Sequence, residues 1–198
     1  QLGHPERLWS NRGARVGDVL VLTKAVGTGT LTGAVKNGEL HYEDISEAVA
    51  SMKTLNRLDL PDELHGAVHA ATDVTGFGIL GHALHLANGS RVTLGLEPSA
   101  VPLLKHADET LSRSILTKAH RSNTAYVQAH VAGREGVGET AWWALTDPQT
   151  SGGLLLSVAA ERVDELLEHL RPRFPKAAVV GRVAERRERA LMLGASGT

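Results

Sequence analysis

Residues 71–82, with the sequence ATDVTGFGILGH, constrain the fold more than any other part of the chain. The small apolar residues before Asp73 predict a buried strand that ends at this carboxylate. Thr75, Gly76 and Gly78 then supply a hydroxyl and two positions where the backbone can approach a ligand closely. An apolar helix follows, and the free N–H groups and partial positive charge of a helix N-terminus suit phosphate.

Asp73 adds a metal-binding group to this turn, because a carboxylate beside bound phosphate can hold Mg²⁺. Strand, carboxylate, glycine turn and helix together predict half of a nucleotide–metal site. The same pattern also fits a purely structural turn, since Gly-x-Gly is common after strands and an Asp before a helix often serves only as an N-cap.

Length and composition narrow the class of protein. The 198 residues, 42% of them hydrophobic, are enough for one large domain or for one domain with a piece of another. A formal net charge of −1 offers no basic surface for nucleic acid, and no apolar run approaches the roughly 20 residues of a membrane span. The absence of cysteine excludes disulfides and thiolate sites from this chain and fits a cytoplasmic protein.

Two more loops with paired glycines lie beside predicted buried strands. Lys24 ends the apolar run 19–24, and the sequence GTGT follows at residues 27–30. Residues 147–153, DPQTSGG, precede the apolar run 154–158. Each loop fits a role in facing an anion, and each fits a shaped structural turn, so the sequence leaves both alternatives open.

The remaining pattern predicts an α+β fold, a mixed β-sheet partly covered by helices. His65 and His69 are interpreted as ordinary polar residues, and His82 and His85 as half-exposed helix residues, in each case in preference to metal ligands. Further strands are expected at 91–96, 177–183 and 190–193, and helices at 31–36, 45–55, from 61, 79–87, 103–111, 123–132 and 163–170, with an irregular polar loop at 112–121.

Four blocks in order, at residues 17–29, 52–56, 71–82 and 147–156, resemble the C-terminal part of the selenophosphate synthetases (selenide, water dikinases). The most specific are TDVTGFG at 72–78 and DPQTSGG at 147–153. The resemblance implies the fold of the aminoimidazole ribonucleotide synthetase superfamily. It also implies a parent enzyme that converts ATP, selenide and water to selenophosphate, AMP and phosphate with Mg²⁺.

The resemblance assigns roles to residues of the first turn. Asp73 matches the one Mg²⁺ ligand that the family takes from its C-terminal domain. The turn containing Thr75, Gly76 and Gly78 is expected to shape the wall on the phosphate side, and Lys24 is a further candidate for positive charge near the ATP site.

The chain also departs from the family. Members carry an N-terminal domain with a glycine-rich mobile segment, a reactive Cys or selenocysteine, a nearby Lys and the remaining metal-binding aspartates. We therefore expect no catalytic residue in this chain, and we interpret the chain as an inactive fragment of a longer parent enzyme. The parent is expected to be a homodimer, and the expected partners are ATP, selenide and the missing N-terminal domain. Residues 1–16 are expected to be a linker or the end of the missing domain, and residues 17–198 the C-terminal domain.

Other functions remain open on the sequence alone. Residues 118–123 follow the family pattern only loosely, so Arg121 and Asn123 receive no ligand role. Thiamine monophosphate kinases and hydrogenase-maturation dehydratases share the superfamily but usually lack the DPQTSGG block. A non-catalytic nucleotide-binding or interaction module of the same fold is the third alternative.

Overall fold

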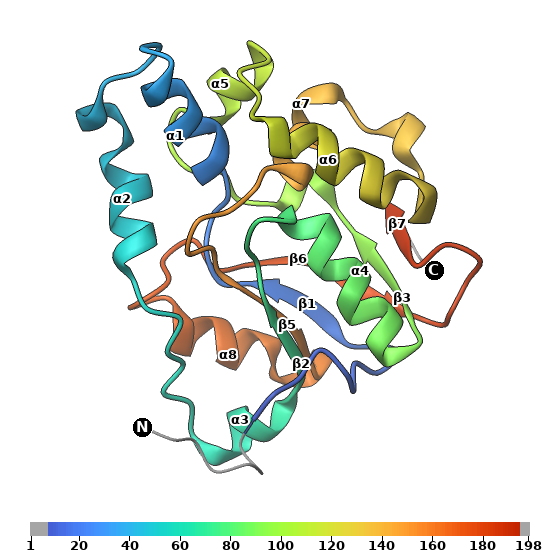
Figure 1. Cartoon of the computed structure of the whole chain (residues 1–198). Coiled ribbons are helices and arrows are strands. Elements are labelled where there is room, and N and C mark those ends of the chain that lie inside the picture. The colour runs from blue at the N-terminus through green and yellow to red at the C-terminus, as the bar shows by residue number, and fades with distance from the viewer. Residues whose placement is uncertain (1–7, 195–198) are drawn as a thin grey trace.

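The computed structural model describes residues 8–194, which form one seven-stranded sheet and the helices packed on it (Figure 1). The strands are β1 (Val19–Leu22), β2 (Val68–Asp73), β3 (Thr93–Leu96), β4 (Val131–Ala132), β5 (Leu154–Val158), β6 (Ala178–Ala184) and β7 (Leu191–Leu193). The helices are α1 (Thr28–Lys36), α2 (Ser46–Lys53), α3 (Asp62–Ala67), α4 (Gly78–Ser90), α5 (Ala107–Ser112), α6 (Lys118–Val127), α7 (Glu139–Thr146) and α8 (Val163–Leu170). Within the described range, none of them is both long and apolar enough to cross a membrane.

The sheet is mixed, as the sequence predicts. Its strand order is β2-β5-β1-β6-β3-β7-β4. Neighbouring strands from β2 to β3 are antiparallel, whereas β3 pairs with β7, and β7 with β4, in parallel. The predicted α+β class with a mixed sheet is therefore confirmed.

β1 lies inside the sheet and is buried on both faces. Successive strand residues point to opposite faces, so a strand covered on both sides needs apolar residues at every position. Leu20 and Leu22 belong to the core under α4, whereas Val19 and Val21 belong to the core under α3 and α8. This double burial explains the continuous apolar run that predicted a strand here.

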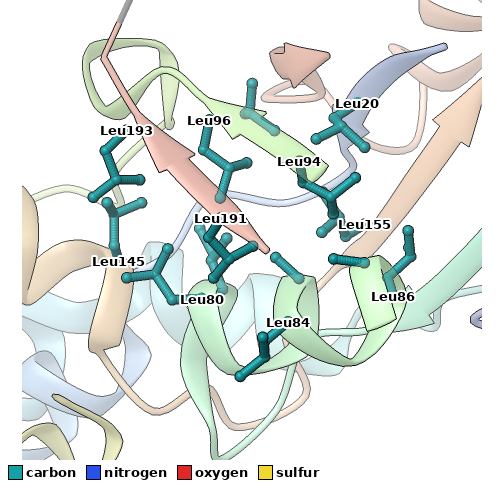
Figure 2. Close-up of a cluster of buried hydrophobic side chains, with 14 of the residues drawn as sticks. Leu20, Leu80, Leu84, Leu86, Leu94, Leu96, Leu145, Leu155, Leu191 and Leu193 are labelled. Atoms are coloured by element: carbon teal, nitrogen blue, oxygen red, sulfur yellow. The ribbon is translucent and has the colours of Figure 1, made fainter. Parts of the chain in front are cut away.

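The larger core lies between the sheet and helices α4 and α7. Figure 2 shows leucines of α4, Leu80, Leu84 and Leu86, beside the strand leucines Leu94 and Leu191. A third, smaller core joins α1, α2 and α5 at one end of the sheet. The sheet end formed by the last residues of β1 and β2 and the first residue of β5 therefore lies between helix-covered faces.

The secondary structure predicted for residues 112–121 and 123–132, between α4 and β5, is wrong. The polar stretch 112–121 is not all irregular, because α6 begins at Lys118. The Thr117 side chain accepts from the third residue of the helix, and His120 Nδ1 accepts the Thr117 N–H at 3.0 Å, so this cap starts the helix without any apolar signal. The helix predicted at 123–132 correspondingly ends at Val127, and β4 occupies 131–132.

α5 also begins later than predicted, at Ala107. Residues near 103 are held in an extended conformation instead, because Val26 and Leu103 form an isolated parallel bridge. The Val26 N–H donates to Pro102 O at 3.0 Å, and the Leu104 N–H donates to Val26 O at 2.9 Å. Pairing with the segment after β1 therefore overrides the helical spacing of the sequence.

The segment that was interpreted as a linker lies partly outside the described residues, which begin at residue 8. Its described part contacts the domain: Trp9 stacks on His65 with ring centroids 4.4 Å apart, and Ser10 O accepts the Ala71 N–H at 2.9 Å. The Ala14 N–H donates to the hydroxyl of Ser90 at 3.1 Å. The boundary at residue 16 remains a prediction.

Gly181 and Gly95 provide a matched test of strand packing between β3 and β6. A Cβ atom at Gly181 would lie 2.0 Å from Gly95 O, a backbone atom that cannot move aside, whereas a Cβ at Gly95 would come no closer than 3.7 Å to Arg182 O. We expect Gly181→Ala to lower the free energy of unfolding by about 2 kcal/mol and Gly95→Ala to change it by less than about 0.5 kcal/mol. Urea denaturation of both variants measures this difference, and equal effects would contradict the register between the two strands.

Candidate functional site

Asp73 is the last residue of β2 and pairs in register with Leu154 at the start of β5. Its side chain is exposed. The carboxylate makes no hydrogen bond or ion pair with any residue between 8 and 194. A solvent-facing carboxylate without an internal partner is available to a cation or to a donor from outside these residues.

The turn after Asp73 is fixed by its backbone. Val74 is fully buried, and its N–H donates to Gly153 O at 2.8 Å. The Gly78 N–H donates to Thr75 O at 3.0 Å, and Gly78 has φ 68°, a left-handed value that favours glycine. A Cβ at Gly78 would lie 2.9 Å from the carbonyl carbon of Thr146, whereas a Cβ at Gly76 would meet nothing within 4 Å. Gly78 is therefore required by packing, and Gly76 leaves the backbone open to the outside.

His82 on α4 is buried and holds the turn from the interior of the protein. The N–H of Thr75 donates to His82 Nε2 at 3.0 Å, and the Thr75 hydroxyl lies 3.0 Å from the same nitrogen. A ring nitrogen that accepts an N–H carries no proton, so His82 is neutral with its proton on Nδ1. Burial lowers the pKa of His82, the Asp73 carboxylate opposes this shift, and His85 adds to it. His82 is thus a buried structural acceptor, and its interpretation as a half-exposed helix residue is wrong, because its ring accepts the Thr75 N–H inside the protein.

Two further residues, one through its side chain and one through its backbone, fix the turn from outside α4. Asn123 of α6 is buried, and its Nδ2 donates to Gly76 O and to Thr146 O, both at 2.9 Å. The backbone N–H of Gln149 donates to Thr75 O at 3.0 Å. The carbonyl groups of the turn are therefore turned toward α6 and the loop before β5. Asn123 received no role from the sequence, although it positions this turn.

The DPQTSGG loop uses its acidic side chain inside the protein. Asp147 is fully buried, and its two carboxylate oxygens accept the N–H groups of Gly29 at 3.1 Å and Thr30 at 2.8 Å. Gln149 Nε2 donates to the same carboxylate at 2.7 Å, and Nε2 of the buried His120 lies 3.0 Å from it. Asp147 therefore faces the N-terminus of α1, where a negative charge is stabilised.

Gln149 satisfies the rest of that helix start. Its Oε1 accepts the N–H of Gly27 at 3.2 Å, the N–H of Thr28 at 3.3 Å and the Thr28 hydroxyl at 3.0 Å. All four N–H groups of residues 27–30 thus donate to Asp147 or Gln149. Of the two alternatives left open by the sequence, the structural turn is the one that the 27–30 loop adopts, and the side chains of the DPQTSGG loop complete it.

The ammonium group of Lys24 is bonded to residues outside the Asp73 turn. Its side chain is buried, and Nζ donates to Thr54 O at 2.6 Å and to Ser151 O at 3.0 Å. Burial lowers the pKa of Lys24, and the charge of Arg173 lowers it further. The structure therefore brings Asp73, Thr75, Gly76 and Gly78 together in one turn, while Lys24 joins the end of α2 to the loop before β5.

An exposed aromatic cluster beside the turn was not predicted. Phe77 is 49% exposed and Tyr126 is 42% exposed, with ring centroids 5.6 Å apart. His85 Nε2 lies 2.9 Å from the Tyr126 hydroxyl. A Cβ at Gly81 would lie 2.5 Å from the Phe77 Cβ, so Gly81 leaves room for that side chain. The only signal in the sequence is the four-residue spacing of positions 77, 81 and 85.

The turn offers one carboxylate to a metal. Among residues 8–194, no three His, Cys, Asp or Glu side chains are grouped so that they could hold an ion. A metal at Asp73 would therefore take its other ligands from a substrate or from residues outside this range. Neither His65 with His69 nor His82 with His85 belongs to such a group within these residues.

The family model for the C-terminal domain of AIR synthase related proteins matches residues 15–194. The chain belongs to this family. A selenide, water dikinase from Bdellovibrio bacteriovorus is 45% identical over 193 residues, which are 96% of this chain and 54% of that relative. Another, from Nitrosomonas eutropha, is also 45% identical, over 96% of this chain and 55% of the relative. The predicted resemblance to selenide, water dikinases is confirmed, and the chain spans about half the length of these relatives.

Solved structures of more distant proteins share the fold. Thiamine-monophosphate kinase from Stenotrophomonas maltophilia K279a superposes with a TM-score of 0.63 at 20% identity, over 96% of this chain and 54% of that chain. The hydrogenase maturation protein HypE in complex with ATP gives a TM-score of 0.58 at 19% identity, over 92% of this chain and 47% of that chain. At this identity the likeness shows the fold.

The Thr75–His82 contact predicts a pH dependence of stability. Because the folded protein lowers the pKa of His82, the unfolded chain binds more protons and acid favours unfolding. The contribution of His82 is fully present above the ordinary pKa of about 6.5 and is lost as the pH falls through the lowered folded pKa. His82→Gln keeps an acceptor for the Thr75 N–H but does not titrate.

Thermal unfolding of both proteins between pH 5 and pH 8 measures this contribution. The difference in stability between His82→Gln and the unsubstituted chain is expected to shift in favour of the variant as the pH falls. A difference that is constant with pH would show that His82 is not the neutral acceptor described.

Proposed function

We propose that the Asp73 turn is one wall of an ATP- and Mg²⁺-dependent site in a protein that makes selenophosphate from selenide, ATP and water, with AMP and phosphate as the other products. The observation that carries this proposal is the exposed carboxylate of Asp73, which has no partner among residues 8–194 and stands beside a turn held rigidly from three sides. The selenide, water dikinases among its relatives support the choice of reaction.

Asp73 fits a Mg²⁺ ligand. Mg²⁺ prefers oxygen ligands and is commonly held by one or two carboxylates together with substrate phosphates. Asp73 supplies one such carboxylate, and its exposure leaves space for the other ligands. When bound, Mg²⁺ neutralises phosphate charge as phosphoryl groups are transferred.

The other residues of this chain orient the wall. Gly76 carries no side chain on the open face of the turn, so the backbone there can approach a phosphate closely. His82, Asn123 and Gln149 hold the groups of Thr75 and Gly76 in place, which fixes the direction of the adjacent carboxylate. The structure of HypE in complex with ATP supports nucleotide binding by a protein of this fold.

Removal of the Asp73 charge tests this assignment in the full-length protein. Asp73→Asn is expected to lower kcat for AMP formation at least about 100-fold, because a lost metal ligand removes several kcal/mol of charge stabilisation. The turnover rate is measured by phosphorus NMR, which follows the loss of ATP and the formation of AMP and selenophosphate in the presence of selenide. Asp164→Asn, an exposed carboxylate in the first turn of α8, is the matched control and should leave turnover unchanged. Near-normal turnover in Asp73→Asn would remove Asp73 from the site.

The isolated chain is expected to be inactive, because it has no cysteine and because the turn supplies only a single carboxylate, that of Asp73, to a metal. Phosphorus NMR should show no AMP and no selenophosphate after incubation with Mg·ATP and selenide. Production of selenophosphate by these 198 residues alone would contradict the proposal that the reactive groups come from elsewhere. Calorimetric titration with Mg·ATP separates the alternative of a self-sufficient nucleotide-binding module, which requires tight binding by the isolated chain.

A further inference from the structure

A cavity of about 360 Å³ lies between the segment after β1, helix α2 and the loop after α8. Its apolar walls include Ala25, Leu104 and Phe174, and hydroxyls of Ser51 and Thr54 also line it. This volume is in the range of small-molecule pockets, which combine apolar walls with a few fixed polar groups. Its position separates it from the Asp73 turn.

The loop before β5 is the partition between the two places. A Cβ at Gly152 would lie 2.2 Å from Val74 O, and a Cβ at Gly153 would lie 2.6 Å from the backbone nitrogen of Lys24. The loop is therefore in contact with the residue after Asp73 on one side and with Lys24 on the other. Lys24 Nζ donates to the carbonyl of Thr54, which lines the cavity.

Positive charge at the cavity exceeds negative charge. Glu47 and Lys176 both line it and form an ion pair at 2.7 Å. Burial acts to raise the pKa of Glu47, but the hydrogen bonds from Lys176 and the Lys105 N–H and the charges of both lysines lower it, so this pair stays ionised. The charge of Glu47 is thus paired with Lys176 and does not neutralise Arg173 or Lys24.

Two cations remain without a carboxylate partner in the described part of the chain. Arg173 is exposed and lines the cavity, and its guanidinium lies 5.9 Å from the centroid of the Phe174 ring. Lys24 is buried and bonded only to carbonyl oxygens, and the positive charge of Arg173 acts on it. An anion that entered the cavity would contact the exposed Arg173 and would reduce the repulsion between Arg173 and Lys24.

We infer that this cavity binds a small anion, a phosphate monoester or carboxylate carried on a compact apolar body. The anionic group would contact Arg173, near the charge of Lys24, and the apolar body would contact Leu104 and Phe174. The site goes beyond the proposed reaction and does not involve Asp73. It gives the positive charge of Lys24, which the sequence assigned to the ATP site, a ligand of its own.

Phenyl phosphate is the probe that combines both features. When it is titrated into the 198-residue chain and followed by amide NMR shifts, it should perturb residues 50–54, 104 and 173–176. Benzoate, which carries a carboxylate in place of the phosphate, should perturb the same residues, and the ratio of the two affinities gives the preferred anion. Arg173→Gln is expected to weaken phenyl phosphate binding about fivefold or more, since a charged contact at a partly exposed site is worth about 1 kcal/mol. Arg171→Gln removes the same charge from an exposed neighbour outside the cavity and should change the affinity less than twofold.

A second variant tests the apolar part of the site. Ala50→Leu adds volume to the cavity wall on α2 and suits a helix, so it should abolish the shifts while the thermal midpoint stays within a few degrees. Phenol and inorganic phosphate each lack one of the two features and should bind more weakly than phenyl phosphate. Equal affinities in Arg173→Gln and Arg171→Gln, shifts outside the cavity, or no shifts at millimolar probe would each overturn the inference.

Discussion

A carboxylate with no solvent exposure, that of Asp147, joins segments that lie far apart in the chain. It accepts two backbone N–H groups at the start of α1 and the side-chain amide of Gln149, and it lies 3.0 Å from His120 Nε2. A buried charge is costly unless donors surround it. Here the donors are supplied by a helix N-terminus, which itself needs acceptors for its first N–H groups. Each group therefore removes a cost that the other would carry alone.

The arrangement around Asp147 also explains how the Asp73 turn keeps its shape. Asn123 bonds both to Gly76 O and to Thr146 O, so the turn is tied to the residue that precedes Asp147. The buried network therefore reaches the turn at Gly76, three residues after the exposed carboxylate of Asp73. The Thr75 N–H, the Thr75 carbonyl and the Gly76 carbonyl are bonded to groups inside the protein, whereas the Asp73 carboxylate faces out. Such a division between satisfied supports and an unsatisfied acceptor is what a preorganised binding site requires.

Much of the fold follows from local patterns in the sequence. The continuous apolar runs that became β1 and β5 match strands buried on both faces, and the apolar spacing of α8 matches the one face that this helix buries. The start of α6 could not be found in this way. Its first turn contains Lys118 and His120, and it depends on a cap made by Thr117 and His120 that carries no hydrophobic signal.

The function of the glycine loops shows a second limit. Residues 27–30 have the composition of an anion-facing loop, and they do face an anion, but it is the side chain of Asp147. The donor and the acceptor are 118 residues apart for Gly29, so neither local spacing nor composition indicates that they meet. Asp73, by contrast, was predicted from residues that are contiguous in sequence and remain contiguous in the structure. The shape of a turn made from contiguous residues is readable from a sequence, whereas supports made across the fold are not.

The position of β1 has a consequence for how the chain reaches this structure. Its two neighbours are β5 and β6, so the first strand of the described residues pairs only with segments more than a hundred residues further along the chain. Contacts of such separation are slow to form, and an apolar strand that waits for them is open to wrong pairing. During synthesis, Val19–Leu22 therefore remains without its sheet partners until β5 and β6 have been made. Shielding of this single four-residue segment during synthesis is therefore a condition for the yield of the folded protein.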